Sequence, residues 1–185
     1  MSEPRPASTL RKASGLTALD LVITLAIIAL LLTTAAPALK DYALNQRMQS
    51  ALARFHASLA MARSEAINRG GRVVVCPSAE IAACAESGDW QHGWMVFLDR
   101  NDDREYQPGE PLLTSEPGVG DLAIRGSRHR TRLRFFANGS APGSNASITF
   151  CDARGAVAAR QLTLSASGRI RLKTPKESDG AACEA

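Results

Sequence analysis

The most apolar part of the chain lies near its start, where nineteen residues from Leu21 to Leu39 carry no charge. About 20 apolar residues cross a bilayer as a helix, so we expect residues 16–39 to form a hydrophobic transmembrane helix. The polar residues 1–15 include Arg5, Arg11 and Lys12, which places the N-terminus in the cytoplasm and the rest of the chain outside the membrane. A cleaved secretory signal is the alternative, because small residues follow the apolar run.

The hydrophobic pattern continues beyond Lys40 with a different geometry. The Gly70-Gly71 pair ends this pattern, and Pro37 should kink the helix. We therefore expect one helix from Thr17 to Arg69, roughly 80 Å long at 1.5 Å per residue. Residues 40–71 would be its amphipathic continuation, packed on a domain. The apolar residues recur at steps of three and four, which is one helical face: Leu44, Met48, Leu52, Phe55, Leu59, Ala62 and Ala66.

After Gly71 the pattern changes to short alternating runs separated by Gly, Pro, Asn and Asp, which is typical of antiparallel strands. The runs are RVVVC, WMVFL, TRLRFF, SITFC, RQLTLS and RIRLK. The sequence thus predicts an α+β fold, in which the long N-terminal helix packs on an antiparallel sheet of roughly six to eight strands. The β-sheet globular domain would span residues 72–173, and residues 174–185 would form a C-terminal tail.

Charge is distributed unevenly over this domain, although the whole chain has a formal net charge of only +4. Residues 76–120 hold nine Asp or Glu against two Arg, a balance of −7, whereas residues 121–176 hold eleven Lys or Arg against two Asp, a balance of +9. This asymmetry indicates an anionic partner for the C-terminal half. A solvated surface is the alternative explanation of the same charges.

Two basic series occupy alternate positions. Arg169, Arg171 and Lys173 would share one face of a strand, about 6.5–7 Å apart, with Ile170 and Leu172 facing the core. A line of cations suits a phosphate backbone, and because no aromatic residue is interleaved we expect contacts without sequence readout. An edge strand protected by charge is the alternative. The segment RGSRHRTRLR adds a secondary set: Arg128, Arg130, Arg132 and Arg134.

The four cysteines form no metal-binding CxxC spacing, and in an exported domain they would form two disulfides. Three pairings are possible. We prefer Cys76–Cys84, which closes a tight local loop, together with Cys151–Cys183, which would attach the tail to the domain.

Other candidate chemistry is sparse. Asp99, Asn101, Asp103 and Glu110 have the spacing of a calcium loop, but Arg104 stands where the sixth residue should be glycine. A polar hairpin loop is therefore the preferred interpretation, with calcium as the alternative. No Ser-His-Asp set, phosphate loop or zinc spacing is visible. We expect no catalytic residue, no metal, no cofactor and no enzymatic activity.

The stretch from Gly15 through LTALD into the apolar helix resembles the N-terminus of type IV pilins and type II secretion pseudopilins. The resemblance implies that residues 1–15 are a prepilin leader, cut after Gly15 by a prepilin peptidase that then methylates the amine of Leu16. Asp20 replaces the usual Glu as counter-charge to a terminal amine in the filament, where unpaired buried ions are costly. A local role at the helix N-terminus is the alternative for Asp20. Pro37 matches the proline of that helix.

In the domain, VVVCPSAE, DWQHGWMVFLDRNDD, RFFANG and LTLSASGRIRLK are similar to the GspH/FimT branch of this family. The glycine before Arg169 and Arg171 is similar to a DNA-binding motif of FimT-type minor pilins. The resemblance implies a subunit that leaves the inner membrane, joins other pilins in a pilus and binds DNA during natural transformation. The alternative is a FimU- or GspH-like subunit that primes assembly of pili or of a type II secretion pseudopilus and binds no DNA.

Overall fold

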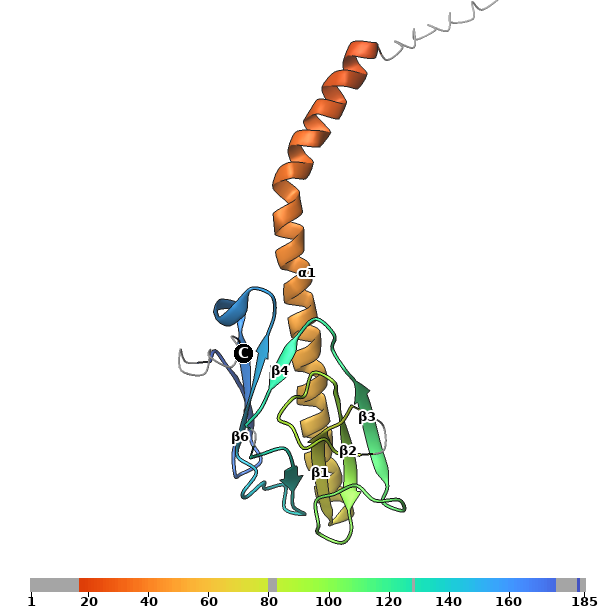
Figure 1. Ribbon diagram of the computed structural model, residues 1–185, viewed down its shortest axis with the longest axis vertical. Coiled ribbons are helices and arrows are strands. Elements are labelled where there is room, and N and C mark those ends of the chain that lie inside the picture. The colour runs from red at the N-terminus through yellow and green to blue at the C-terminus, as the bar shows by residue number, and fades with distance from the viewer. Residues whose placement is uncertain (1–16, 80–82, 128, 176–182, 184–185) are drawn as a thin grey trace, which may run out of the picture. The chain divides into compact units, whose positions relative to one another are not determined.

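The computed structural model describes residues 17–79, 83–127, 129–175 and 183, apart from the side chain of Thr34. Its first element, α1 (Ala18–Arg69), is the single long helix that the sequence predicts (Figure 1). The chain divides into two compact units, Met1–Ala43 and Leu44–Ala185. The first part of α1 therefore belongs to one unit, and its second part is the helix of the globular unit.

In the first unit, the large apolar side chains of α1 between Leu19 and Leu39 are all exposed, and Pro37 lies inside the helix. Within the described residues, no single helix has the length and apolarity needed to cross a membrane. The stretches Ala18–Thr33 and Ala35–Arg69, joined at a bend, meet that requirement together. The transmembrane helix over residues 16–39 remains a prediction.

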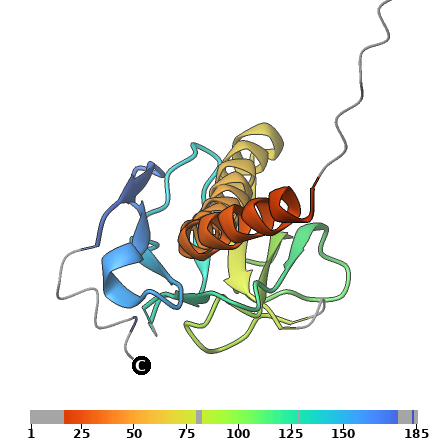
Figure 2. The same ribbon diagram turned by 90° about the horizontal axis from the view of Figure 1, so that it is seen from above.

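In the globular unit, one face of α1 is buried against both sheets, as Figure 2 shows from above. The predicted apolar positions from Met48 to Ala66 are all buried, whereas Leu44 is partly exposed. Phe55 is at the centre, with ring centroids 5.2 Å from Trp90, 5.0 Å from Trp94 and 5.7 Å from Phe150. Full burial of such a side chain is worth about 1.5–3 kcal/mol, so this contact is a principal link between helix and sheets.

The first sheet has the order β3-β2-β1-β5 and is antiparallel throughout. Every position of β1 after its first residue is buried, because both faces of the strand are covered. One face joins the main core, while Val74 and Cys76 pack with Met95 and Phe97 in a smaller cluster. The strands are β1 (Arg72–Pro77), β2 (Gly93–Asp99), β3 (Leu112–Pro117) and β5 (Leu133–Phe135).

The second sheet has the order β4-β6-β7-β8 and is also antiparallel. A short 3-10 helix, η1 (Gly155–Ala158), connects β6 to β7. The fold is α+β as predicted, but the strands form two four-stranded sheets instead of one, and β3 and β4 were not anticipated. The strands of this sheet are β4 (Ala123–Arg125), β6 (Ala146–Cys151), β7 (Arg160–Leu164) and β8 (Ile170–Lys173).

Both preferred disulfides are present. Cys76 and Cys84 are eight residues apart, and Cys76 is fully buried in the smaller cluster. Cys151, at the end of β6, is joined to Cys183, 32 residues further along the chain. The first disulfide thus fastens the loop after β1, and the second fastens the C-terminal segment to the second sheet.

Candidate functional site

The hairpin of β7 and β8 positions the first basic series. Its antiparallel register sets Thr163 opposite Arg171 and Gln161 opposite Lys173. Because partners in a register share a face, the hydroxyl and amide side chains of β7 lie beside the cations of β8. β8 is the last strand of its sheet, so its outer backbone edge has no strand partner among the described residues.

Gly168 closes this hairpin and determines where the basic series begins. Its φ of +73° is left-handed, and its N–H donates to the carbonyl oxygen of Ser165 at 2.9 Å. A Cβ on Gly168 would lie only 2.0 Å from the carbonyl oxygen of Gly139. A side chain therefore meets both strain and a steric clash here, and Arg169 follows directly from a turn that requires glycine.

A groove of about 370 Å³ runs along the hairpin. Its three cationic side chains are exposed, and none of them forms an ion pair with any residue that the structure describes. The lining combines these cations with small hydroxyls and one apolar side chain: Thr163, Leu164, Ser165, Ser167, Arg169, Arg171 and Lys173.

The predicted orientation of β8 is only half correct. Ile170 is partly buried and packs against the main core, but Leu172 is 54% exposed. The core does not extend as far as Leu172, because β8 lies at the margin of the sheet. The basic series therefore lies on a strand that is solvated for most of its length.

The hydroxyl groups of the groove were not identified from the sequence. Thr163 Oγ1 donates to the carbonyl oxygen of Arg171 at 3.3 Å, and Ser165 Oγ donates to that of Arg169 at 3.3 Å. Ser165 and Ser167 are 3.0 Å apart through their hydroxyls. The sequence did carry one signal: RQLTLS and RIRLK both alternate with period two and flank Gly168. A hairpin with its turn at this glycine would place the hydroxyls beside the cations.

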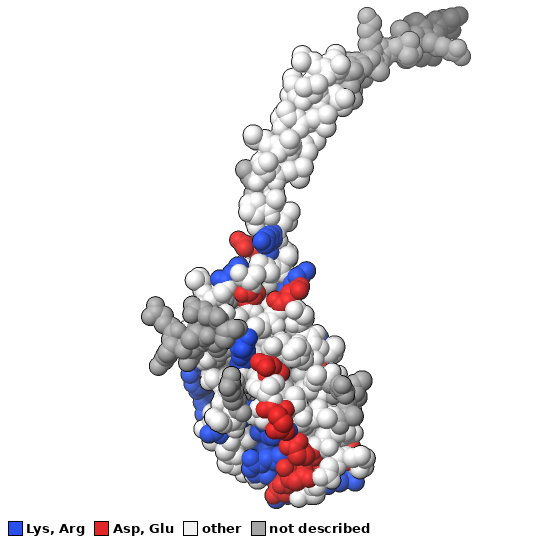
Figure 3. Space-filling model, viewed as in Figure 1, with Lys and Arg blue, Asp and Glu red and all other residues white. Residues whose placement is uncertain are grey.

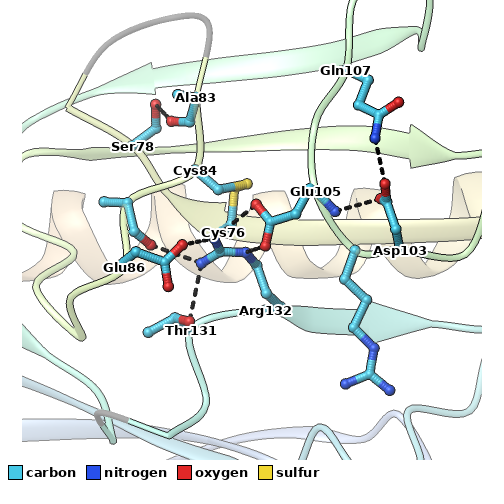
Figure 4. A network of polar contacts seen from close by, with 12 residues as sticks. Cys76, Ser78, Ala83, Cys84, Glu86, Asp103, Glu105, Gln107, Thr131 and Arg132 are labelled. Atoms are coloured by element: carbon cyan, nitrogen blue, oxygen red, sulfur yellow. Dashed lines mark hydrogen bonds and ion pairs between the residues drawn. A yellow bond between two sulfur atoms is a disulfide. The ribbon is translucent and has the colours of Figure 1, made fainter.

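The secondary basic set does not form one row. Arg128 lies outside the described residues, and the guanidinium of Arg130 donates to the carbonyl oxygen of Gly143. Figure 4 shows Arg132 between Glu86 and Glu105, each with an ion-pair distance of 2.8 Å. The side chain of Arg132 is only 9% exposed.

Arg134 is also engaged within the protein. It forms an ion pair with Asp102, and its guanidinium carbon lies 4.5 Å from the ring centroid of Phe136. Only 11% of its side chain is exposed. Arg132 and Arg134 thus connect β5 and the segment before it to acidic loops, and their charges are already compensated.

These contacts revise the meaning of the charge asymmetry. Figure 3 shows the helix surface of the first unit almost free of charge, while Asp and Glu form a band beside Lys and Arg on the globular unit. The acidic and basic segments of the sequence meet in space through Arg132, Arg134 and the 4.0 Å pair of Arg125 with Asp89. Much of the basic excess is therefore neutralised internally, whereas the β8 series forms no ion pair with a described residue.

The loop between β2 and β3 uses its carboxylates for backbone contacts. Asp99 accepts hydrogen bonds from the backbone N–H of Asp102 at 2.7 Å and of Arg104 at 3.3 Å. Glu110 accepts from the N–H of Arg100 at 2.8 Å. Burial raises the pKa of Asp99. Within the described residues, no group of three or more His, Cys, Asp or Glu side chains is arranged to hold a metal ion, so the calcium alternative gains no support.

The predicted assembly residues are only partly described. Gly15 and Leu16 lie outside the described residues, and Pro37 lies in α1. The carboxylate of Asp20 accepts hydrogen bonds from the N–H of Thr17 at 3.0 Å and from its hydroxyl at 2.7 Å, while the N–H of Asp20 donates to Thr17 Oγ1 at 3.3 Å. This reciprocal pair is a capping box. It gives Asp20 a local role, and its pairing with a terminal amine stays a prediction.

Known proteins resemble this chain in sequence. The family model described as "Type II transport protein GspH" matches residues 51–168. The pilin-like protein PilA1 of Thermus thermophilus is 30% identical over 166 residues, which cover 86% of this chain and 97% of that protein. The family-model match begins within α1 and ends at Gly168, before β8.

Solved structures resemble it in fold. Two crystal structures of the Pseudomonas aeruginosa type IV minor pilin FimU match with TM-scores of 0.54 and 0.57 at 24% and 23% identity. They cover 68% and 70% of this chain and 91% and 90% of FimU. The helix packed on antiparallel sheets is thus the pilin fold, and the chain belongs to the GspH family of type IV pilin-like proteins.

Proposed function

We propose that this protein is a FimT-like minor type IV pilin that binds DNA without sequence preference for uptake during natural transformation. The observation that carries the proposal is the exposed series of Arg169, Arg171 and Lys173, whose charges are not compensated by any described residue. Its role is assembly and binding, not catalysis.

The groove suits a phosphate backbone in both charge and spacing. Alternate residues of β8 place the cations about 6.5–7 Å apart on one face, close to the spacing of successive phosphates along an extended single strand. Among the described residues, no aromatic side chain lines the groove, so these residues offer bases no stacking platform. Binding should therefore depend on phosphates, with a steep salt dependence and little sequence preference.

The assembly part of the proposal rests on the N-terminal segment and on family membership. Prepilin peptidase would cut after Gly15 and methylate Leu16, and the first part of α1 would hold the subunit in the inner membrane with its globular unit in the periplasm. Other pilins would then replace lipid around the exposed apolar side chains between Leu19 and Leu39. In a dry helix bundle, Asp20 would compensate a terminal amine.

A second candidate function uses the same fold without DNA. β8 is an edge strand, and charged side chains on an edge strand prevent unwanted strand addition. On this basis the protein would be a FimU- or GspH-like subunit that primes a pilus or a type II secretion pseudopilus. The two functions differ only in what the basic series contacts.

A binding experiment distinguishes the two candidate functions. A labelled oligonucleotide is added to the full chain in a non-ionic detergent, and its fluorescence anisotropy is measured across a salt series. We expect Arg169→Ala with Arg171→Ala to weaken binding at low salt by about tenfold or more and to reduce the slope of log K against log salt by about 1.4 to 1.8. The matched control is Arg47→Ala with Arg69→Ala, which removes two exposed arginines that are ion-paired on α1. Equal binding by both double variants would refute the DNA site.

A further inference from the structure

The helix α1 also approaches the turn from which the basic series starts. Arg63 of α1 places its Nε beside the two glycines that meet there: a Cβ on Gly139 would lie 3.0 Å from this nitrogen, and a Cβ on Gly168 would lie 3.4 Å from it. The helix, the loop after β5 and the β7–β8 turn therefore converge on one side chain.

The convergence is held by backbone contacts. The carbonyl oxygen of Gly139 occupies the space next to Gly168 that a side chain would need. Beside it, the N–H of Ala141 donates to the carbonyl oxygen of Ala166 at 2.8 Å. The absence of both glycine side chains leaves the space into which Arg63 extends, so its position is set by the same contact that sets Arg169.

Arg63 differs from the other arginines of α1 in the globular unit. Arg47 pairs with Asp121, Arg54 with Glu116, and Arg69 with Glu65. Arg63 has no ion pair with a described residue, and its Nε is buried without a hydrogen-bond partner. Because the Arg63 side chain as a whole is only partly buried, an anion can reach its terminal guanidinium N–H groups but not the enclosed Nε–H, and a charge-assisted contact there would stabilise the cation.

We propose that Arg63 is a fourth cation of the same phosphate-binding surface, so that this surface continues from β8 across the Gly168 turn onto α1. The inference rests on the proposed function. Arg63 lies beside Gly168, the residue that precedes Arg169, so a phosphate chain that follows β8 and crosses the turn would meet a further positive charge there. The bound strand would therefore contact one more phosphate than β8 alone can reach.

The test compares Arg63→Gln with Arg69→Gln, a charge removal on the same helix at an ion-paired residue. Anisotropy of a labelled duplex is measured for the full chain in a non-ionic detergent between about 50 and 200 mM salt. We expect Arg63→Gln to lower affinity about three- to tenfold at the lowest salt and to reduce the salt slope by about 0.9, the value for one duplex phosphate contact. Arg69→Gln should match the unaltered chain, and Arg63→Lys should retain the slope.

A second measurement does not depend on a variant. In the unaltered, ¹⁵N-labelled chain, the Nε–H resonance of Arg63 should shift on addition of the oligonucleotide, and that of Arg69 should stay unchanged. If Arg171→Ala weakens binding while Arg63→Gln behaves like Arg69→Gln and the Arg63 resonance does not move, this inference is overturned and the proposed function stands. If the unaltered chain binds no oligonucleotide, the proposed function fails and this inference fails with it.

Discussion

At the scale of single residues, Gly168 illustrates how one position can determine the direction of an exposed basic series. Its left-handed φ alone would disfavour a side chain, but Gly143 and Gly155 have the same φ of +73° with nothing within 4 Å of a Cβ. Gly168 differs because a carbonyl oxygen fills that space. The steric requirement, added to the backbone requirement, fixes the direction in which Arg169 leaves the turn.

Gly168→Ala should therefore destabilise the protein by about 2–4 kcal/mol, because the loop around Gly139 must move. Gly143→Ala, with only the φ penalty, should cost about 1 kcal/mol. Urea unfolding followed by tryptophan fluorescence measures both free energies of unfolding, since Trp90 and Trp94 are fully buried. An equal decrease in the free energy of unfolding in the two variants would show that the carbonyl oxygen of Gly139 adds no steric cost at Gly168.

Asp152 supplies a prediction about pH. The side-chain hydrogen bonds from Arg154 lower the pKa of this buried carboxyl. Because its pKa is lower in the folded state, the carboxylate stabilises the protein above the ordinary Asp pKa of about 4, and this contribution is lost as pH falls through the folded-state pKa.

Asp152→Asn should thus reduce the free energy of unfolding by about 1–3 kcal/mol at neutral pH. The difference from the unaltered chain should shrink as the pH falls below about 4. Urea titrations at a series of pH values test this, and a difference that is constant down to acid pH would contradict the assignment.

At the scale of elements, Arg132 shows how an arginine with a structural role differs from the arginines proposed to bind DNA. It holds the segment before β5 to Glu86, beyond the Cys76–Cys84 loop, and to Glu105 in the β2–β3 loop (Figure 4). Its guanidinium also donates to the carbonyl oxygen of Ala85 at 2.7 Å. Because Arg132 joins its own segment to two others, its side chain is part of the packing of all three.

Arg132→Ala should lower the free energy of unfolding by about 1–3 kcal/mol, because a nearly buried guanidinium and its hydrogen bonds are lost, while its partners Glu86 and Glu105 are exposed to solvent. At temperatures below its unfolding midpoint, the Arg132→Ala variant should show the same slope of log K against log salt for DNA binding as the unaltered chain. Arg171→Ala should show the reverse, with stability within about 0.5 kcal/mol and a reduced slope. Thermal unfolding and anisotropy on the same samples measure the stability and the salt slope of both variants. A reduced slope for Arg132→Ala would mean that Arg132 also contacts DNA.

The elements also show how far sequence patterns reach. The helix and six strands were predicted because their apolar residues repeat at 3.6 or 2.0 positions. β3 and β4 were not predicted, because LLTSEP has no buried position and AIR is only three residues long. Two sheets could not be distinguished from one, because strand periodicity carries no information on partners.

The candidate site was predictable to a similar degree. The β8 series was predicted because alternation within one strand fixes its face. Arg132 and Arg134 alternate in the same manner, yet their partners come from residues 27 to 46 positions away, so the sequence could not show that their charges are used. Arg63 is more distant still from the glycines that it contacts.

At the scale of the whole molecule, the local contacts of Asp20 make the assembly hypothesis testable. Thr17 and Asp20 cap the helix together, so loss of the cap and loss of the charge can be separated. If Asp20 compensates a terminal amine in a filament, Asp20→Ala should leave membrane insertion intact and abolish incorporation into sheared pili.

The control is Thr17→Val, which removes the two hydrogen bonds of the Thr17 hydroxyl but keeps the carboxylate and its bond from the backbone N–H of residue 17. It should be incorporated normally, with a cost to the helix of about 1 kcal/mol. Immunoblots of membrane and sheared-pilus fractions measure both steps. If the two variants were incorporated into pili to the same extent, the role of Asp20 would be limited to capping the helix.

The disulfide between Cys151 and Cys183 has a mechanical consequence. Among the described strands, β8 pairs only with β7, and hydrogen bonds of a terminal hairpin separate one at a time when a strand is peeled from its end. Both hairpin strands, however, lie between the two cysteines. A polymer that pulled on the groove would therefore load a covalently closed loop, and the force would pass through the disulfide into β6, inside the sheet. Detachment of β8 would stop once the loop closed by the disulfide was fully extended. A subunit under tension would therefore stay attached to the filament even with its outermost strand detached.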